Sequence, residues 1–401
     1  MWINRRISNK LKEITQSFPV VVVTGARQVG KTSLLAHVFP QWKLISLDYP
    51  SLASFANDNP EQFLKEHKPP LIIDEVQYAP QLFRYLKILV DKNRHLKGQY
   101  ILTGSQKFVL MENVSESLSG RCAILELETL SLSEILAEIP AEISVHHQNQ
   151  TLFDALIRGG FPEINADPTI DLSFYFESYL ATYLERDIRN LLKVHNLRDF
   201  GRFVRACGFR SAQILNKAEL AKDIGISPTT ANDWLTILEA SNQVFILEPW
   251  FSNKTKGLVK SPKIYLMDTG LLCHFYNIKS KEDFFQSPAR GAIWETFVCS
   301  ELRKYQQWQQ GRPQLWMFRT LSQLEVDFMI QKGGRFHLIE AKLKETIEKK
   351  DARQLFDAQS LLGQENILSL NMITPTETVS SLEGGKIFIY PLDQLPKTLF
   401  E

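Results

Sequence analysis

Residues 19–39, PVVVVTGARQVGKTSLLAHVF, constrain the fold more than any other stretch of the chain. A β-branched run comes first, a glycine-containing loop follows, and a helical pattern completes the stretch. The loop, residues 25–32, matches the phosphate-binding pattern GxxxxGK[ST] in full. The alternative is a chance match on an ordinary strand–turn–helix, which the strand before the loop and the helix after it disfavour.

The phosphate-binding pattern predicts a role for the residues of the loop. Backbone N–H groups would surround the phosphates of a nucleotide. Lys31 would reach the β- and γ-phosphates, and Thr32 would place its hydroxyl on Mg²⁺. With ATP and Mg²⁺ as the cofactors, the predicted nucleotide-binding residues are Gly25, Ala26, Arg27, Gln28, Val29, Gly30, Lys31, Thr32 and Ser33.

A second signal lies in residues 69–80, PPLIIDEVQYAP, where a short apolar strand ends in two acids. Carboxylates at the end of a buried strand are costly unless they meet a cation or a polar site. Asp74 is therefore predicted to hold Mg²⁺, and Glu75 to polarise the attacking water. A third strand, QYILTGS, would bring Ser105 near the γ-phosphate.

Two further strands are expected at residues 44–48 and 123–128. Strands that alternate with helices imply a parallel sheet covered on both faces. The first 150 residues are thus expected to form an α/β P-loop domain that hydrolyses ATP.

Six motifs, in the order GARQVGKT, LISLDYP, LIIDEVQ, ILTGSQ, LSGR and GGFPE, resemble one family. They resemble the bacterial and archaeal AAA-type ATPases that carry a DUF4143 C-terminal region. The resemblance implies an additional-strand P-loop core with sheet order 5-1-4-3-2 and a charge-sensing arginine. Arg121 is the best match for that arginine and Arg158 is a second candidate, although either could equally be a surface or fold-stabilising residue. Because an arginine supplied in trans commonly completes such sites, a homo-oligomer is expected.

Composition limits the remaining possibilities. A chain of 401 residues favours two or three domains, and 46 basic against 45 acidic residues mean that any nucleic-acid surface is local. The four cysteines are far apart and form no CxxC, which favours reduced thiols in the cytoplasm. No apolar run approaches the roughly 20 residues that span a bilayer, and no cleavage-site pattern follows the basic N-terminus. A cytoplasmic protein without a membrane partner is expected.

Residues 151–211 are helical by pattern and are expected to form a lid or connector. In residues 216–247 a helix, a turn at Gly225 and a second helix starting at Ser227-Pro228 predict a helix-turn-helix. With VFILEPW and IYLMD as wing strands, residues 212–270 would form a winged helix.

The predicted winged helix suggests contact with DNA. The segment between the wing strands, residues 251–263, contains four lysines and no acid. A basic wing would contact phosphates, while the recognition helix would meet base edges in the major groove. In many ATPases, however, this fold is only a rigid lid or a protein-docking module. The residues predicted to contact DNA are Thr229, Thr230, Asn232, Lys254, Lys256 and Lys260; the fourth lysine is Lys263.

Near the C-terminus, residues 324–342 form two alternating segments around Gly333-Gly334. If these glycines are a two-residue turn, Lys332 pairs with Arg335. Asp327 then faces Glu340 and Glu325 faces Lys342, all on one side of the sheet. Facing Cβ atoms lie about 4.5–5.5 Å apart, so Asp327 and Glu340 could share a divalent cation.

This hairpin resembles the PD-(D/E)xK nuclease superfamily. The resemblance implies Asp327 as the aspartate of the second motif, Glu340 and Lys342 as the ExK, and Glu295 as the helical acid. Val326 departs from the pattern, because proline often precedes the aspartate. The alternative is cross-strand ion pairing, with a glutamate opposite a lysine on a wet face. The fold would then persist as a binding module without cleavage.

The sequence therefore predicts an AAA/ASCE-type P-loop ATPase followed by a helical lid, a winged helix and a restriction-endonuclease-like α/β domain. The domains are expected at 1–150, 151–211, 212–270 and 271–401. Lys31, Glu75, Ser105 and Arg121 are the predicted catalytic residues, and Thr32 and Asp74 the metal ligands. The predicted function is ATP hydrolysis coupled to binding, remodelling or metal-dependent cleavage of DNA. The alternative is a nucleotide-dependent switch that binds a protein partner without a DNA role.

Overall fold

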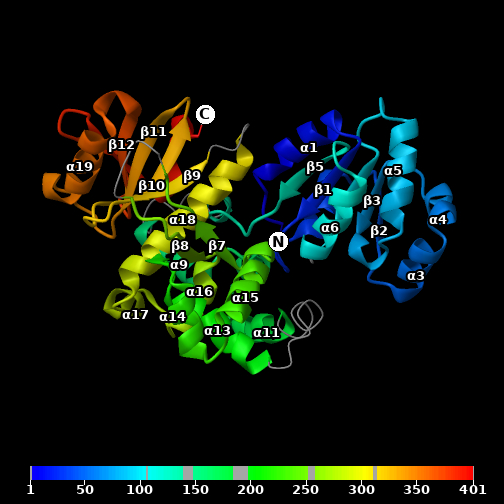
Figure 1. Cartoon of the computed structure of the whole chain (residues 1–401), viewed down its shortest axis with the longest axis horizontal. Coiled ribbons are helices and arrows are strands. Elements are labelled where there is room, and N and C mark those ends of the chain that lie inside the picture. The colour runs from blue at the N-terminus through cyan, green and yellow to red at the C-terminus, as the bar shows by residue number, and fades with distance from the viewer. Residues whose placement is uncertain are drawn as a thin grey trace. The chain divides into compact units, whose positions relative to one another are not determined.

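A computed structural model describes residues 2–104, 107–138, 148–183, 197–251, 258–309 and 314–400 (Figure 1). The chain divides into two compact units. The first unit comprises residues 4–129 with residues 240–242, and the second comprises residues 1–3, 130–239 and 243–401. The first unit thus ends before the boundary expected at residue 150.

The first unit contains a five-stranded parallel sheet in the order β2-β3-β4-β1-β5. This is the predicted order 5-1-4-3-2 read from the other edge, so the prediction is confirmed. Every residue of β1, β3 and β4 is buried, as expected for central parallel strands. The strands are β1 (Val20–Thr24), β2 (Lys43–Ser46), β3 (Leu71–Asp74), β4 (Tyr100–Thr103) and β5 (Cys122–Glu126).

Helices connect these strands and contribute to the core of the first unit. Leu82, Phe83 and Leu86 of α5, for example, pack in one cluster with Val20 and Val22 of β1. The helices of this unit are α1 (Ile7–Ser17), α2 (Lys31–Val38), α3 (Pro50–Asp58), α4 (Pro60–Glu66), η1 (Val76–Tyr78), α5 (Leu82–Lys92) and α6 (Lys107–Ser117).

The second unit begins with helices in the region expected to be helical. They are α7 (Leu132–Leu136), α9 (Gln148–Arg158), α10 (Pro162–Ala166), α11 (Leu172–Tyr183) and α13 (Leu197–Phe209). The following segment forms the expected helices and strands, with its strands antiparallel in the order β6-β8-β7. These elements are β6 (Gln213–Ile214), α14 (Lys217–Ile224), α15 (Pro228–Ala240), β7 (Val244–Leu247) and β8 (Lys263–Leu266).

Local hydrogen bonds fix the starts of α14 and α15. Asn216 caps α14, because its side chain accepts from the backbone N–H of Glu219 at 3.2 Å. Ser227 Oγ accepts from the backbone N–H of Thr230 at 3.0 Å, at the start of α15. The predicted turn and its Ser-Pro helix start therefore form as expected.

The C-terminal part contains a six-stranded mixed sheet in the order β13-β14-β12-β11-β10-β9. Its strands are β9 (Leu315–Arg319), β10 (Glu325–Lys332), β11 (Arg335–Ala341), β12 (Ile367–Thr374), β13 (Ser380–Leu382) and β14 (Ile387–Pro391). Its helices are α16 (Thr269–Phe275), α17 (Lys281–Gln286), α18 (Arg290–Trp308), η3 (Lys349–Ala352), α19 (Arg353–Leu362), η4 (Gln364–Asn366), η5 (Leu392–Gln394) and η6 (Lys397–Leu399). In the β10–β11 hairpin Lys332 pairs with Arg335 and Phe328 with Ile339, which confirms the predicted register over residues 328–339.

One hydrophobic core runs through all parts of the second unit. It includes Phe203 of α13, Trp234 of α15, Trp294 of α18 and Phe328 of β10. These residues come from the three segments that the sequence separates at 211 and 270. Packing therefore continues across both of those positions.

Candidate functional site

The phosphate loop lies between β1 and α2, and close packing shapes it. Gly25 has φ +147°, and a Cβ added there would lie 2.2 Å from the carbonyl oxygen of Leu127. Arg5 holds the loop from the other side, because its guanidinium donates to the carbonyl oxygens of Val29 at 3.0 Å and of Glu128 at 2.7 Å. Sequence reasoning missed Arg5, since nothing in its surroundings points to the loop.

Lys31 is the first residue of α2 and is buried. Its ammonium donates to the carbonyl oxygens of Gly25 at 2.9 Å and Ala26 at 2.8 Å. The lysine thus reaches back over the loop, where a phosphate would meet it together with the loop's backbone N–H groups. The contact of Lys31 with the β- and γ-phosphates stays a prediction.

Asp74 ends β3 and meets two hydroxyl groups. Thr32 Oγ1 donates to Asp74 Oδ2 at 2.9 Å, and Thr103 Oγ1 donates to Asp74 Oδ1 at 3.2 Å. Burial raises the pKa of Asp74, while these hydrogen bonds oppose the shift. Mg²⁺ prefers hard oxygen ligands, so the Thr32 hydroxyl and the Asp74 carboxylate fit this ion and would hold it with the phosphates.

Glu75 follows β3 with a left-handed backbone, φ +53°. Gln77 Nε2 donates a short hydrogen bond to Glu75 Oε2. Gln77 is only 6% exposed, and its Oε1 has no hydrogen-bond partner within the described ranges. Gly104 leaves room for this amide, because a Cβ at Gly104 would lie 2.3 Å from Gln77 Oε1. Sequence reasoning missed Gln77, although its place two residues after Glu75 was a usable signal.

Of the polar residues at the end of β4, Thr103 contacts the site directly through Asp74. The predicted Ser105 lies outside the described residues. The role that the sequence assigned to Ser105 therefore remains a prediction, whereas Thr103 was not singled out.

The two candidate arginines bind groups outside the Thr32–Asp74 cluster. Arg121 directly precedes β5, and the pairing of Val20 with Cys122 puts it at the sheet edge opposite the phosphate loop of its own chain. It binds Asp91 through Nε and Nη2, at 2.6 and 2.9 Å. Arg158 belongs to the second unit and donates to the carbonyl oxygen of Ile164 at 2.6 Å. Arg121 therefore does not contact the phosphate loop of its own chain.

The residues of the predicted nuclease site do come together, and a lysine lies among them. Lys263 Nζ pairs with Glu295 Oε1 at 2.7 Å, Glu325 Oε1 at 2.5 Å and Asp327 Oδ1 at 3.5 Å. The side chain of Lys263 is 3% exposed. The sequence placed Lys263 on a solvated basic wing, and this was wrong because β8 carries it into the interior.

Glu340 and Lys342 complete this acidic cluster. Lys342 Nζ binds Glu340 Oε1 at 2.7 Å, and the backbone N–H of Ala341 donates to Asp327 Oδ2 at 2.9 Å. Glu325 pairs with Arg319 at 3.0 Å, not with Lys342 as expected from the hairpin. Burial and the nearby Asp327 raise the pKa of Glu340 to about 8, and the same two causes raise that of Glu295 to about 7.

A divalent metal does not fit this acidic cluster as it stands. The ammonium of Lys263 lies within ion-pair distance of the Glu295 and Asp327 carboxylates that a metal would need. Across the described residues, no group of three or more His, Cys, Asp or Glu side chains is arranged to hold a metal ion. Glu340 Oε2 is buried and has no hydrogen-bond partner among the described residues, while Glu340 Oε1 is already bound by Lys342.

The residues predicted to contact DNA differ in their exposure and in their contacts. Thr229 and Asn232 are exposed on α15, and Asn232 accepts a hydrogen bond from Lys217 at 2.7 Å. Thr230 is engaged with Ser227 at the helix start. Lys260 lies 5.6 Å from the ring centre of Phe251, which is 55% exposed. Lys254 and Lys256 lie outside the described residues.

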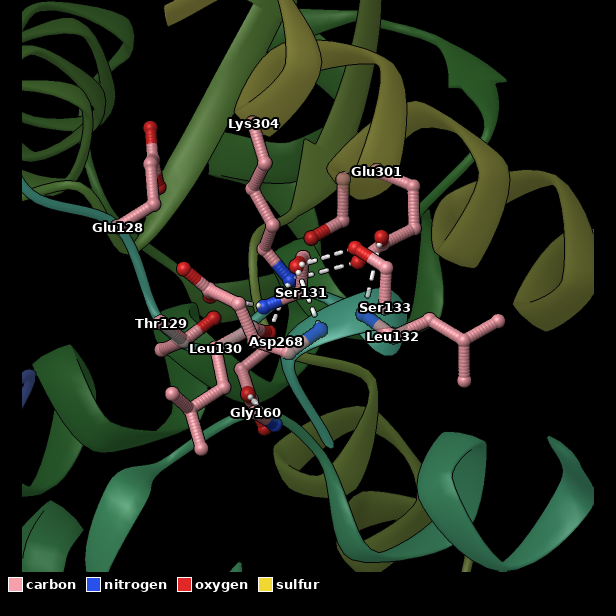
Figure 2. A network of polar contacts seen from close by, with 12 residues as sticks. Glu128, Thr129, Leu130, Ser131, Leu132, Ser133, Gly160, Asp268, Glu301 and Lys304 are labelled. Atoms are coloured by element: carbon pink, nitrogen blue, oxygen red, sulfur yellow. Dashed lines mark hydrogen bonds and ion pairs between the residues drawn. The ribbon is translucent and has the colours of Figure 1, made fainter. Parts of the chain in front are cut away.

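A buried polar clasp holds the start of the second unit (Figure 2). Lys304 Nζ donates to the carbonyl oxygen of Leu130 at 2.8 Å and to Glu301 Oε1 at 2.9 Å. Glu301 Oε2 accepts from the backbone N–H of Leu132 at 3.0 Å. The backbone N–H of Leu130 donates to Gly160, whose own N–H donates to Asp268 Oδ2 at 2.8 Å. Burial raises the pKa of Asp268 and of Glu301.

The GGFPE motif belongs to this clasp. Gly159 has φ +79°, and a Cβ there would lie 2.3 Å from Asp268 Oδ1. The GGFPE motif therefore packs closely against the turn that starts α16. The contact is made by Asp268, which also accepts the hydrogen bond from Gly160.

Two general predictions can be compared with the described chain. None of its helices is long and apolar enough to span a membrane. Cys122, Cys207, Cys273 and Cys299 are all free thiols.

The sheet order, the phosphate loop and the Thr32–Asp74 pair define a P-loop ATPase of the AAA type. The model of the AAA domain family matches residues 17–136, and two domain families of unknown function, DUF8612 and DUF4143, match residues 149–282 and 290–395. The chain belongs to the same family as the uncharacterized protein Rv2008c of Mycobacterium tuberculosis. The two are 30% identical over 410 residues, which cover 99% of this chain and 86% of the relative. The uncharacterized protein Mb2031c of Mycobacterium bovis gives the same values.

Solved structures show weaker similarity. The Walker-type ATPase PABY2304 of Pyrococcus abyssi is 16% identical, with a TM-score of 0.43, over 69% of this chain and 96% of that one. The RuvB Holliday junction branch migration motor of Thermotoga maritima is 16% identical, with a TM-score of 0.30, over 61% and 89%. The ADP form of ORC2 of Aeropyrum pernix is 12% identical, with a TM-score of 0.32, over 61% and 87%.

Proposed function

We propose that this protein hydrolyses ATP at the carboxyl edge of the β2-β3-β4-β1-β5 sheet. The observation that carries the proposal is Asp74 held between the hydroxyls of Thr32 and Thr103, beside the loop that Lys31 covers. Two loop residues and two strand ends thus converge on the place where the β- and γ-phosphates would lie.

The reaction assigns a role to each of these groups. A water oxygen attacks the γ-phosphorus, the bond from phosphorus to the β,γ-bridging oxygen breaks, and ADP and phosphate result. Glu75 orients this water and takes its proton, which passes to the phosphate product. Lys31 and the loop N–H groups stabilise the phosphate oxygens. Mg²⁺, bound through Thr32 and Asp74, would neutralise charge on the β- and γ-phosphates.

Assays of phosphate release and of nucleotide binding test ATP hydrolysis and ATP binding separately. We expect Lys31→Ala to lose ATP binding, and Glu75→Gln to bind ATP normally while kcat falls by about 100-fold or more. Lys65→Ala is the matched control, because this lysine pairs with Glu61 on the surface of α4. Full activity in Glu75→Gln would contradict the role given to Glu75.

We also propose that Arg121 completes the site of a neighbouring subunit. Its position at the opposite edge of its own sheet supports action in trans. Lys31→Ala and Arg121→Ala should each be inactive alone, and mixing them should restore part of the activity, because the first variant supplies Arg121 to the second. No recovery in a mixture that forms mixed oligomers would refute action in trans.

A DNA role is proposed for the helix-turn-helix. The antiparallel order β6-β8-β7 beside α13, α14 and α15 supports a winged helix, and α15 exposes Thr229 and Asn232. Lys260 and the exposed Phe251 lie at the wing. The exposed Asp233 and Glu239 on the same helix favour the competing function, docking of a protein partner.

Salt-dependent binding separates these two functions. We expect DNA affinity to fall as salt rises, and to fall further in a variant with Lys254, Lys256 and Lys260 changed to alanine. Changing Lys349, an exposed lysine on η3, should have no effect. Absence of DNA binding at low salt would leave the protein-docking function.

A further inference from the structure

We propose that Lys263 is a permanent internal cation of the acidic cluster and keeps divalent metals out of it. The cluster is defined as Lys263, Glu295, Arg319, Glu325, Asp327, Glu340 and Lys342. The inference is independent of the ATPase and DNA proposals. It concerns the part of the chain for which metal-dependent cleavage was predicted.

Strand pairing on both sides fixes the position of Lys263. In β8 it pairs with Leu247 of β7 and with Ile214 of β6, so its backbone cannot slide. All four residues of β8 are buried. The side chain is therefore committed to the interior, where an unpaired ammonium would be costly.

The ammonium has as many acceptors as it has donors. Its three N–H groups can be used by one oxygen each of Glu295, Glu325 and Asp327. Tyr265, two residues further along β8, donates to the same oxygen of Glu295 at 2.7 Å. A metal could bind these oxygens only if Lys263 lost partners in a buried place.

The charges of the acidic cluster are also largely offset without a metal. Four carboxylates face three cationic side chains, which are Lys263, Arg319 and Lys342. One net negative charge therefore remains, which is less than the two positive charges that a divalent metal would add.

Manganese titration tests the proposal directly. The full-length chain would carry Asp74→Asn, so that the nucleotide site contributes no metal, and free Mn²⁺ would be followed by electron paramagnetic resonance without nucleotide. We expect no saturable binding. Adding Lys263→Ala should create one Mn²⁺ site per chain, and a further Asp327→Asn should abolish it.

The control for the Mn²⁺ titration is Lys344→Ala, which removes a lysine outside the acidic cluster and should gain no Mn²⁺ site. Lys263→Met keeps the aliphatic stem and replaces the alanine variant if that one does not fold. One Mn²⁺ bound to the Asp74→Asn parent and lost with Asp327→Asn would overturn the proposal, and so would a folded Lys263 variant that gains no site.

Discussion

Gln77, the last residue of the LIIDEVQ motif, holds the carboxylate of Glu75, the proposed catalytic base. It donates to Glu75 Oε2, is buried, and fits against the Cα of Gly104 at the end of β4. The amide therefore links Glu75, which is proposed to orient water, to the strand end next to the phosphate loop. In the proposed mechanism Gln77 acts through Glu75, as a positioning residue.

At this scale we expect Gln77→Ala to lower kcat for ATP by about 10- to 100-fold, a range typical of residues that orient a catalytic group. KM should change little, because no phosphate contact is lost. Steady-state phosphate release gives both parameters. Gln62→Ala is the control, since its amide only meets Glu66 on the surface of α4. A change in KM alone would show that Gln77 acts on binding.

The raised pKa of Glu340, about 8 against an ordinary 4.5, predicts an unusual pH dependence. Burial is the main cause; Asp327 and Glu295 add to it, and Lys342 opposes it. Between these values the folded chain keeps a proton that the unfolded chain has released. The free energy of unfolding therefore falls as pH rises through this window.

We expect Glu340→Gln to reduce the decrease in the free energy of unfolding with rising pH. For one proton this decrease is at most about 1.4 kcal/mol per pH unit. Urea unfolding of wild type and variant at several pH values between these pKa limits measures the difference. Glu345→Gln, at an exposed position, should leave the slope unchanged. A variant with the wild-type slope would show that Glu340 is ionised in the folded chain.

At the scale of elements, some parts were predictable because their causes are local. The phosphate loop and the β10–β11 register each depend on neighbouring residues and on one turn. Lys263 was not predictable, because its run of lysines is typical of a solvated loop and its partners lie 32, 62 and 64 residues away. Periodicity assigns a face to a strand but does not say which distant element covers it. The position of Arg121 at the edge of the sheet opposite the phosphate loop likewise could be assigned only from the strand pairing.

The tight turn at Gly159 gives a prediction for an element. We expect Gly159→Ala to lower the free energy of unfolding by about 2 kcal/mol or more, because the positive φ is strained for alanine and Asp268 blocks its Cβ. Chemical unfolding measures this. Gly291→Ala in the first turn of α18 is the control, because a Cβ there meets nothing within 4 Å. Equal stability of the two variants would contradict the tight closure.

At the scale of the whole molecule, the nucleotide residues lie in the first unit and the clasp in the second. Lys304→Met would leave Glu301 buried without its cation, so we expect the second unit to lose about 3 kcal/mol of stability. ADP affinity should stay unchanged. Hydrogen exchange of α18 and ADP titration measure the two effects, with Lys349→Met as the surface control. Weaker ADP binding would show that the clasp also stabilises the first unit.

The acidic cluster sets a limit on how this chain can be divided. Its central cation comes from the segment before residue 270, and its carboxylates come from the segment after it. A fragment that starts at residue 271 would keep four acids and lose Lys263, so it would be unstable as a stand-alone module. Exchange of parts between relatives would therefore have to keep Lys263 together with residues 271–401. The smallest segment that relatives could exchange is therefore longer than the domain boundary expected at residue 270 suggests.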